Sequence, residues 1–313
     1  MDCSKYRRIV SKSVQTTLTG VSIDECVIRP FVTESKYFNY LGSIILCTTF
    51  PIGVNELAKE TSTVLSSNIS MKMMAEGLKR SSETQDVTQT PIFKEVIVNL
   101  GDERTILDIG AGVGRFTAPL ASAGCHVTAI EPSTEMISYL KETLSRYNVS
   151  ESVDIVQSSW PTDNSKLAEV ALATFVIQFS DDWVAFARAM EKWATNRCIL
   201  AVHVDPLMFF MERLWPIFNP DKPNPRMPGF TEIYPALLNA GIIGNVKVFE
   251  EQHGPRWKNV EEALPMISGR LGIAENVEAM KKLEDILRDP TSEVFKTRPH
   301  RVAMISWAPP KSI

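Results

Sequence analysis

The most constraining feature of this chain is a glycine-rich turn that follows a short apolar run. Residues 106–117 read Ile-Leu-Asp-Ile-Gly-Ala-Gly-Val-Gly-Arg-Phe-Thr, and a second apolar run, Val-Thr-Ala-Ile, ends at Glu131. A strand, a glycine-rich turn, a helix and a second strand ending in a carboxylate are typical of a βαβ unit that holds a ribose-bearing cofactor. A side chain at Gly110 or Gly112 would intrude where the backbone must approach the ligand, and Glu131 can accept hydrogen bonds from two ribose hydroxyls.

The spacing of the glycines separates two classes of cofactor. Dinucleotide-binding turns require Gly-x-Gly-x-x-Gly, in which the third glycine lets the helix pack tightly on the strand. Here Arg115 stands at that third position, and the glycines are Gly110, Gly112 and Gly114. The sequence therefore disfavours a dinucleotide, although a dinucleotide and a turn without any ligand remain as alternatives.

The pattern Asp-x-Gly-x-Gly-x-Gly, which begins at Asp108, resembles the first motif of class I S-adenosylmethionine-dependent methyltransferases. The resemblance implies that the turn faces the methionine part of S-adenosylmethionine, that Asp108 takes part in binding its amino group and that Glu131 binds the ribose. It also implies S-adenosylhomocysteine as the product. The cofactor-binding residues expected on this basis are Asp108, Gly110, Ala111, Gly112, Gly114, Glu131, Pro132, Met136, Ser158, Ser159, Trp160, Thr174 and Gln178.

Strand and helix patterns alternate downstream of the turn, which predicts an α/β fold. With the resemblance, this becomes a seven-stranded, mostly parallel sheet with helices on both faces and a last, antiparallel strand inserted beside the sixth. The expected strands are residues 105–109, 126–130, 153–157, 171–178, 198–203, 245–250 and 301–307. The expected helices are residues 71–80, 91–100, 115–123, 134–147, 181–194, 232–239, 260–271 and 275–288.

Two kinds of segment fall outside this alternation. Residues 1–70 are rich in Ser and Thr and form an N-terminal extension or arm of unknown role. The resemblance implies that residues 71–313 form a methyltransferase domain, with a core at 105–307 and lid-like insertions at about 206–230 and 251–290. The first insertion is rich in Pro and aromatic residues, and a lid, a packed connection and a dimer interface remain open for it. Residues 249–264 loosely resemble the insertion that covers the active-site mouth in small-molecule methyltransferases.

Composition narrows the classes of partner. The chain has 313 residues, a net charge of −4, 44% hydrophobic and 22% charged residues, which is ordinary for a soluble globular protein. Lys and Arg form no basic stripe, so a nucleic-acid partner is disfavoured. Residues 37–55 are uncharged but fall short of about 20 predominantly apolar residues, so we expect no membrane span.

The five cysteines give neither a disulfide framework nor a metal site. They are odd in number and no Cys-x-x-Cys pair occurs, so we expect no metal and a reducing, cytoplasmic location. Cys125 and Cys198 lie in or beside apolar runs and are expected to be buried as small apolar side chains.

The methyl acceptor is expected at the carboxyl ends of the strands, where open α/β sheets bind ligands. That edge carries Gln178, Phe179, His203 and Asp205. His203 is the first candidate for a catalytic base and His253 the second, while a structural role remains open for both and His126 is expected to be structural. The family commonly has an acid after the third strand, where this chain has Ser158 and Ser159; Trp160 could stack on adenine or simply pack, and Asp163 is a fallback acid.

These features predict an S-adenosylmethionine-dependent methyltransferase. Its acceptor is expected to be a small, partly apolar molecule attacked at O, N or C in an in-line displacement, with a homodimer possible. Two alternatives remain open: a non-catalytic cofactor-binding regulator or scaffold, and a methyltransferase that acts on protein or tRNA.

Overall fold

A computed structural model describes residues 75–80, 82, 85–205, 210–224, 226–253, 257, 259–292, 294–295 and 298–310, apart from the side chains of Gln252, His253 and Arg298. The predicted N-terminal arm, residues 1–70, lies outside these residues and stays a prediction. Within the described part of the chain, no helix combines the length and apolarity needed to cross a membrane.

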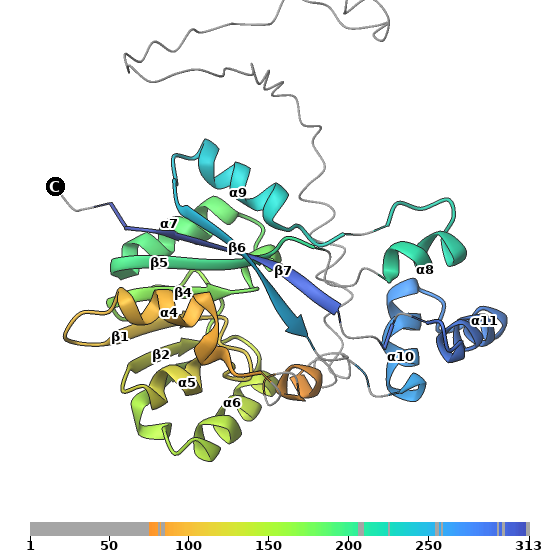
Figure 1. The fold of residues 1–313 in the computed structure, drawn as a ribbon, viewed down its shortest axis with the longest axis horizontal. Coiled ribbons are helices and arrows are strands. Elements are labelled where there is room, and N and C mark those ends of the chain that lie inside the picture. The colour runs from red at the N-terminus through yellow and green to blue at the C-terminus, as the bar shows by residue number, and fades with distance from the viewer. Residues whose placement is uncertain are drawn as a thin grey trace, which may run out of the picture. The chain divides into compact units, whose positions relative to one another are not determined.

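The described strands form one seven-stranded sheet in the order β3-β2-β1-β4-β5-β7-β6 (Figure 1). The pairs β1–β2, β1–β4, β2–β3 and β4–β5 are parallel, whereas β7 is antiparallel to both β5 and β6. The predicted fold class is therefore confirmed, including the insertion of the last strand beside the sixth. The strands are β1 Thr105–Ile109, β2 His126–Ile130, β3 Val153–Val156, β4 Ala168–Thr174, β5 Ala194–His203, β6 Asn245–His253 and β7 Arg298–Trp307.

Helices cover both faces of the sheet because the central strands bury side chains in both directions. In β1, Ile106 packs into the core formed with α4 (Pro91–Val98), α5 (Thr117–Ser122) and α6 (Thr134–Arg146). Its neighbour Leu107 points the other way, into the core formed with α7 (Trp183–Trp193) and α9 (Phe230–Asn239). Each fully buried Ile or Leu contributes roughly 1.5–3 kcal/mol.

Side-chain caps set the starts of α6 and α7, whereas α5, which follows the glycine turn, has none. Ser133 accepts a hydrogen bond from the backbone N–H of Met136 and so begins α6, and Asp182 does the same for Ala185 at the start of α7. Three short 3-10 helices complete this part of the chain: η2 Val87–Gln89, η3 Ser150–Ser152 and η4 Ile177–Phe179.

Three further helices, α8 (Met211–Phe218), α10 (Val260–Leu271) and α11 (Val277–Arg288), share an apolar core of their own and are grouped together in Figure 1. We call them the helical cluster. Phe210 and Trp257 meet in it edge to face, with ring centroids 5.7 Å apart. The described parts of the two predicted insertions thus pack against each other. Their role as a lid stays a prediction.

The fourth strand differs most from its predicted bounds. β4 begins at Ala168 and ends at Thr174, because Phe175 adopts a left-handed backbone conformation, with φ +59°, and η4 follows at once. An aromatic residue rarely takes this conformation outside strained or functional positions. β5, β6 and β7 are also longer than predicted, and β7 begins at Arg298, so that His300 lies within the sheet. The helix predicted from residue 115 begins at Thr117 instead.

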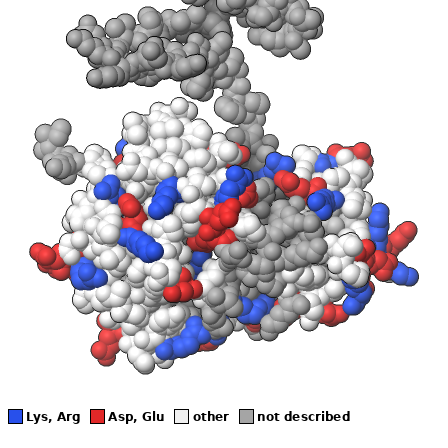
Figure 2. Space-filling view, viewed as in Figure 1, with Lys and Arg blue, Asp and Glu red and all other residues white. Residues whose placement is uncertain are grey.

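Cys125 and Cys198 are buried, as predicted. Charged side chains of both signs are interspersed on the face of the molecule shown in Figure 2.

Candidate active site

The glycine turn is attached directly to the end of β2. The backbone N–H groups of Gly110 and Ala111 both donate to the carbonyl of Ile130, over 2.8 and 3.1 Å. Gly110, Gly112 and Gly114 all have left-handed backbones, with φ of +70°, +57° and +89°. The turn therefore requires residues without a Cβ, whatever it binds.

Among the residues that the structure describes, nothing packs closely against the Cβ position of one of the three glycines, Gly112. A Cβ at Gly110 would lie 2.4 Å from Cγ1 of Val176, and a Cβ at Gly114 would lie 2.7 Å from Cδ1 of Leu140. For a Cβ at Gly112, the nearest atom of the described residues is the carbonyl oxygen of Gly110, 4.0 Å away. From sequence, glycine at position 110 was explained by the close approach of a ligand. In the structure, neighbouring side chains already leave no room for a Cβ at Gly110 or at Gly114. Gly112 is the position where a ligand can approach.

Glu131 lies against this open position. Its Oε2 accepts from the backbone N–H of Gly112 over 2.9 Å and its Oε1 accepts from the backbone N–H of Ser133 over 3.0 Å. Burial raises the pKa of Glu131, and the two backbone hydrogen bonds partly offset that rise. The carboxylate is therefore held at the turn by backbone groups on both of its oxygens.

Asp108 brings a second carboxyl group to the same turn. It is almost fully buried, and Thr117 Oγ1 donates to its Oδ2 over 2.6 Å. Burial raises the pKa of Asp108 to about 6; the Thr117 hydrogen bond lowers it and the charge of Glu131 raises it further. Two desolvated acids beside an open backbone favour a ligand that carries positive charge.

Residues after β3 divide into surface and packing positions. Ser159 is exposed, and Ser158 Oγ donates to its carbonyl over 3.1 Å. Trp160 Nε1 donates to the carbonyl of Phe186 on α7 over 3.1 Å, a contact that favours the packing alternative for this indole. The fallback acid Asp163 is an exposed surface residue that pairs with Lys192 at 2.7 Å.

Gln178 has a buried acceptor without a partner. Its Nε2 donates to the carbonyl of Phe175 over 2.7 Å, and only 6% of the residue is exposed. Among the residues that the structure describes, none donates a hydrogen bond to its Oε1. An unpartnered buried acceptor is costly, and a ligand N–H could satisfy it. Thr174 ends β4 just before this segment, and Phe179 is 48% exposed.

The remaining predicted cofactor contacts lie around the turn. Pro132 is exposed next to Glu131, and Ala111 is buried in the core on the α4–α6 face. Met136 is buried with Val113 and Ala75.

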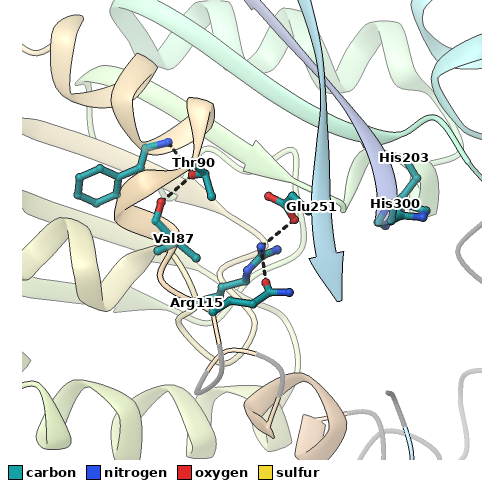
Figure 3. A network of polar contacts seen from close by, with 8 residues as sticks. Val87, Thr90, Arg115, His203, Glu251 and His300 are labelled. Atoms are coloured by element: carbon teal, nitrogen blue, oxygen red, sulfur yellow. Dashed lines mark hydrogen bonds and ion pairs between the residues drawn. The ribbon is translucent and has the colours of Figure 1, made fainter. Parts of the chain in front are cut away.

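His203, at the end of β5, forms a close pair with His300 of β7. His203 Nδ1 lies 2.6 Å from His300 Nε2 (Figure 3). The ring of Phe175 stacks on His203 with centroids 4.3 Å apart. Asp205 is bound to Arg301 through the backbone N–H and the guanidinium, which lowers the pKa of Asp205. His126 is exposed at the start of β2. The backbone of His253 ends β6, but its side chain lies outside the described residues.

Arg115 connects the glycine turn to β6, the strand at one edge of the sheet. Its guanidinium donates to Oε2 of Glu251 on β6 over 2.8 Å (Figure 3). It also donates to Oε1 of Gln85 over 2.8 Å and lies 5.7 Å from the centroid of the Phe175 ring. The Arg115 and Glu251 side chains are 19% and 6% exposed, so this ion pair is largely removed from water.

Sequence reasoning missed Phe175, His300 and the partner of Arg115. Phe175 was placed inside a strand, His300 before the last strand, and Arg115 served only to reject a dinucleotide. Each depends on contacts between distant segments, and no local pattern signals them. Among the described residues, no group of three or more His, Cys, Asp or Glu side chains is arranged to hold a metal ion.

Comparison with known proteins agrees with this geometry. Residues 106–196 match a protein family described as a methyltransferase domain. No protein of curated function matches the chain. Similar solved structures include a candidate methyltransferase from Bacillus halodurans, at 13% identity over 71% of this chain and 99% of that chain, with a TM-score of 0.47. Magnesium protoporphyrin IX methyltransferase from Synechocystis, solved with S-adenosylhomocysteine, has 13% identity over 79% and 92% and a TM-score of 0.45. Geranyl diphosphate C-methyltransferase from Streptomyces coelicolor has 11% identity over 69% and 78% and a TM-score of 0.40.

The strand order, the antiparallel β7 and the glycine turn that ends β1 define a class I methyltransferase fold. Residues 106–196, which match the family described as a methyltransferase domain, run from β1 into β5 of this fold.

Proposed function

We propose that this chain transfers a methyl group from S-adenosylmethionine to a small, partly apolar acceptor. The observation that carries the proposal is the Glu131 carboxylate, which backbone N–H groups hold beside the open position at Gly112. A sugar hydroxyl beside this carboxylate would gain charge-assisted hydrogen bonds, each worth about 1.5–3 kcal/mol.

The residues around the turn suit S-adenosylmethionine. Asp108 supplies a carboxyl group for the cationic amino group, Glu131 supplies an acceptor for the ribose hydroxyls, and Gly112 leaves room for close approach. Gln178 offers an acceptor oxygen that lacks a donor among the described residues. When bound, S-adenosylmethionine supplies a methyl group that its sulfonium charge has already activated.

The task left to the protein is to align the acceptor and to exclude water. Proximity and orientation alone can lower the barrier by roughly 7–11 kcal/mol. The carboxyl ends of β4 and β5 combine apolar and polar side chains, namely Phe175, its stacking partner His203 and the exposed Phe179. That mixture supports a small acceptor with an apolar body and a polar reacting group.

Calorimetry and a methyl-transfer assay together test the proposal. The full chain should bind S-adenosylmethionine and S-adenosylhomocysteine, and Glu131→Ala should weaken both. With tritiated S-adenosylmethionine, label should enter small aromatic acceptors rather than bulk tRNA or denatured protein. Binding without transfer to any of these would favour the non-catalytic alternative, and label in tRNA or protein would favour the macromolecular one. The net charge of −4 and the interspersed charges on the face shown in Figure 2 argue against tRNA.

A further inference from the structure

The histidine pair joins two strand ends at the carboxyl edge of the sheet. His203 is the last residue of β5 and pairs across the sheet with Val302, and His300 precedes Val302 by two residues on β7. Side chains two residues apart on a strand point to the same face, which brings both imidazoles together. Their facing nitrogens lie 2.6 Å apart, and the rings meet edge to face with centroids 4.7 Å apart.

Two imidazoles at this distance must share one proton. Imidazole has two nitrogens, and in a hydrogen bond between Nδ1 of His203 and Nε2 of His300 one nitrogen donates and the other accepts. A neutral pair therefore leaves one outward nitrogen unprotonated, either Nε2 of His203 or Nδ1 of His300. The pair can take up one proton at that position and keep its hydrogen bond, whereas a second proton would break the bond. The two rings thus titrate as a unit.

The charged surroundings accommodate one positive charge on the pair. Asp205 lies near His300, and its carboxylate stays ionised because Arg301 binds it. Glu251 stands opposite His300 in the β6–β7 register, and Arg115 binds Glu251. Phe175 covers a face of His203, which limits the access of water to that ring.

We propose that His203 is the base that deprotonates the methyl acceptor, that His300 is a positioning residue that fixes the tautomer of His203, and that the acceptor is a hydroxyl compound. The inference rests on the proposed function. In the step, the acceptor oxygen forms a bond to the methyl carbon and the bond between that carbon and sulfur breaks, with the electron pair left on sulfur. The hydroxyl proton moves to Nε2 of His203, whose Nδ1–H donates to Nε2 of His300.

The acceptor class follows from the presence of a base. A neutral amine or a thiolate carries its own reactive electron pair and needs no base before attack. A hydroxyl is a poor nucleophile until its proton is removed, and a positioned base accelerates such a step by about 10²–10⁴-fold. A histidine pair that can take up one proton and keep its hydrogen bond suits a phenol or an alcohol.

Nitrogen NMR of the full chain, labelled in its histidine rings and saturated with S-adenosylhomocysteine, tests proton sharing without turnover. The chain has four histidines, so the signals of His203 and His300 can be assigned with single variants. We expect both rings to titrate with one common midpoint and to take up one proton in total. In His300→Phe, His203 should titrate alone at a shifted midpoint, while His126→Phe, at an exposed site, should change neither. Independent midpoints in the unsubstituted protein, with two protons bound, would overturn the pair.

Methyl transfer from tritiated S-adenosylmethionine to small phenols and to their matched anilines tests the base and the acceptor class. His203→Gln should lower kcat for phenols at least about 100-fold while the Kd for S-adenosylhomocysteine stays unchanged. His300→Phe should displace the midpoint of the pH–rate profile, and His300→Gln, which can still accept from Nδ1–H, should restore part of the rate. Label in anilines only, or in none of the phenols, would overturn the acceptor class. Failure of the unsubstituted protein to bind S-adenosylhomocysteine would instead overturn the proposed function.

Discussion

The backbone N–H of Gly112 donates to Oε2 of Glu131 over 2.9 Å, so that the acid at the end of β2 lies against the glycine of the turn whose Cβ position no described residue packs against closely. Glu131→Ala should therefore weaken S-adenosylhomocysteine binding by roughly 1.5–3 kcal/mol, the worth of one charged hydrogen bond, or about 10- to 150-fold in Kd. Calorimetry measures the change. Glu151→Ala, an exposed acid in η3, is the control, and equal affinities of the two variants would refute the ribose role.

Gly112→Val should abolish cofactor binding, because its side chain would fill the space beside Glu131. Gly124→Val is a matched control, since Gly124 also has a positive φ, +82°, and open space around its would-be Cβ. Both variants carry a similar backbone strain, so both should melt at lower temperatures. Only the first should lose S-adenosylhomocysteine binding in calorimetry, and binding by both at similar Kd would contradict close approach of the ligand at Gly112.

The affinity for S-adenosylmethionine should depend on pH through Asp108. The pKa of Asp108 is raised to about 6 in the free protein, and a bound cation would favour its ionised form. Affinity should then rise with pH up to about 6 and level off above it, with proton release on binding below that value. Calorimetry in buffers of different ionisation enthalpy measures the released protons. Asp108→Asn should remove the pH dependence, whereas the exposed Asp154→Asn should keep it; a flat wild-type profile would rule out this role.

The raised pKa of Asp108 also predicts that the stability of the cofactor-free fold falls as pH rises, whereas the affinity for S-adenosylmethionine rises. A carboxyl group whose pKa is higher in the folded state stabilises the fold below its ordinary value of 3.8 and loses that contribution as pH rises through about 6. At neutral pH, Asp108→Asn should therefore unfold at a higher temperature than the unsubstituted protein in the absence of cofactor. Thermal melts at pH 4 and pH 7 check this, because the advantage should shrink at the lower pH; an equal advantage at both would exclude titration as its cause.

Breaking the Arg115–Glu251 pair should destabilise the fold. Arg115→Met would leave a carboxylate that is only 6% exposed without this cation, and removing one partner of a buried pair costs about 3–5 kcal/mol. Because Arg115 is partly exposed, we expect the free energy of unfolding to fall by about 3 kcal/mol, at the lower end of this range. Chemical denaturation measures it, with Lys166→Met as the control because its pair with Asp154 is exposed and contributes at most about 1 kcal/mol. Similar losses in both variants would mean that the Arg115–Glu251 pair contributes no more to stability than an exposed ion pair.

The cofactor turn and the sheet could be predicted because their signals are local. Glycines at fixed spacing, a strand that ends at Glu131 and alternating apolar runs all lie within short windows of sequence. The bounds of α10, Val260–Leu271, were predicted to the residue, since Asn259 caps the helix and Gly272 ends it in a left-handed conformation. The prediction of a buried Cys125 and Cys198 also required nothing beyond their apolar neighbours.

The acceptor side could not be predicted because its contacts join distant segments. His203 and His300 are 97 residues apart in sequence, and Arg115 and Glu251 are 136 apart. The end of β4 was misplaced for a related reason: Phe175 takes a left-handed backbone that its residue type disfavours, and its contacts with His203 and Arg115 come from other elements. A propensity argument cannot anticipate a conformation that tertiary packing imposes.

The core shared by α8, α10 and α11 links two stretches of sequence that are separated by α9 and β6. Phe210 comes from the first stretch and Trp257 from the second, and neither stretch buries its aromatic residue without the other. Grafting one stretch from a relative would leave half of an interface exposed to water. Any redesign of this protein by segment exchange must therefore transplant both stretches as a matched set.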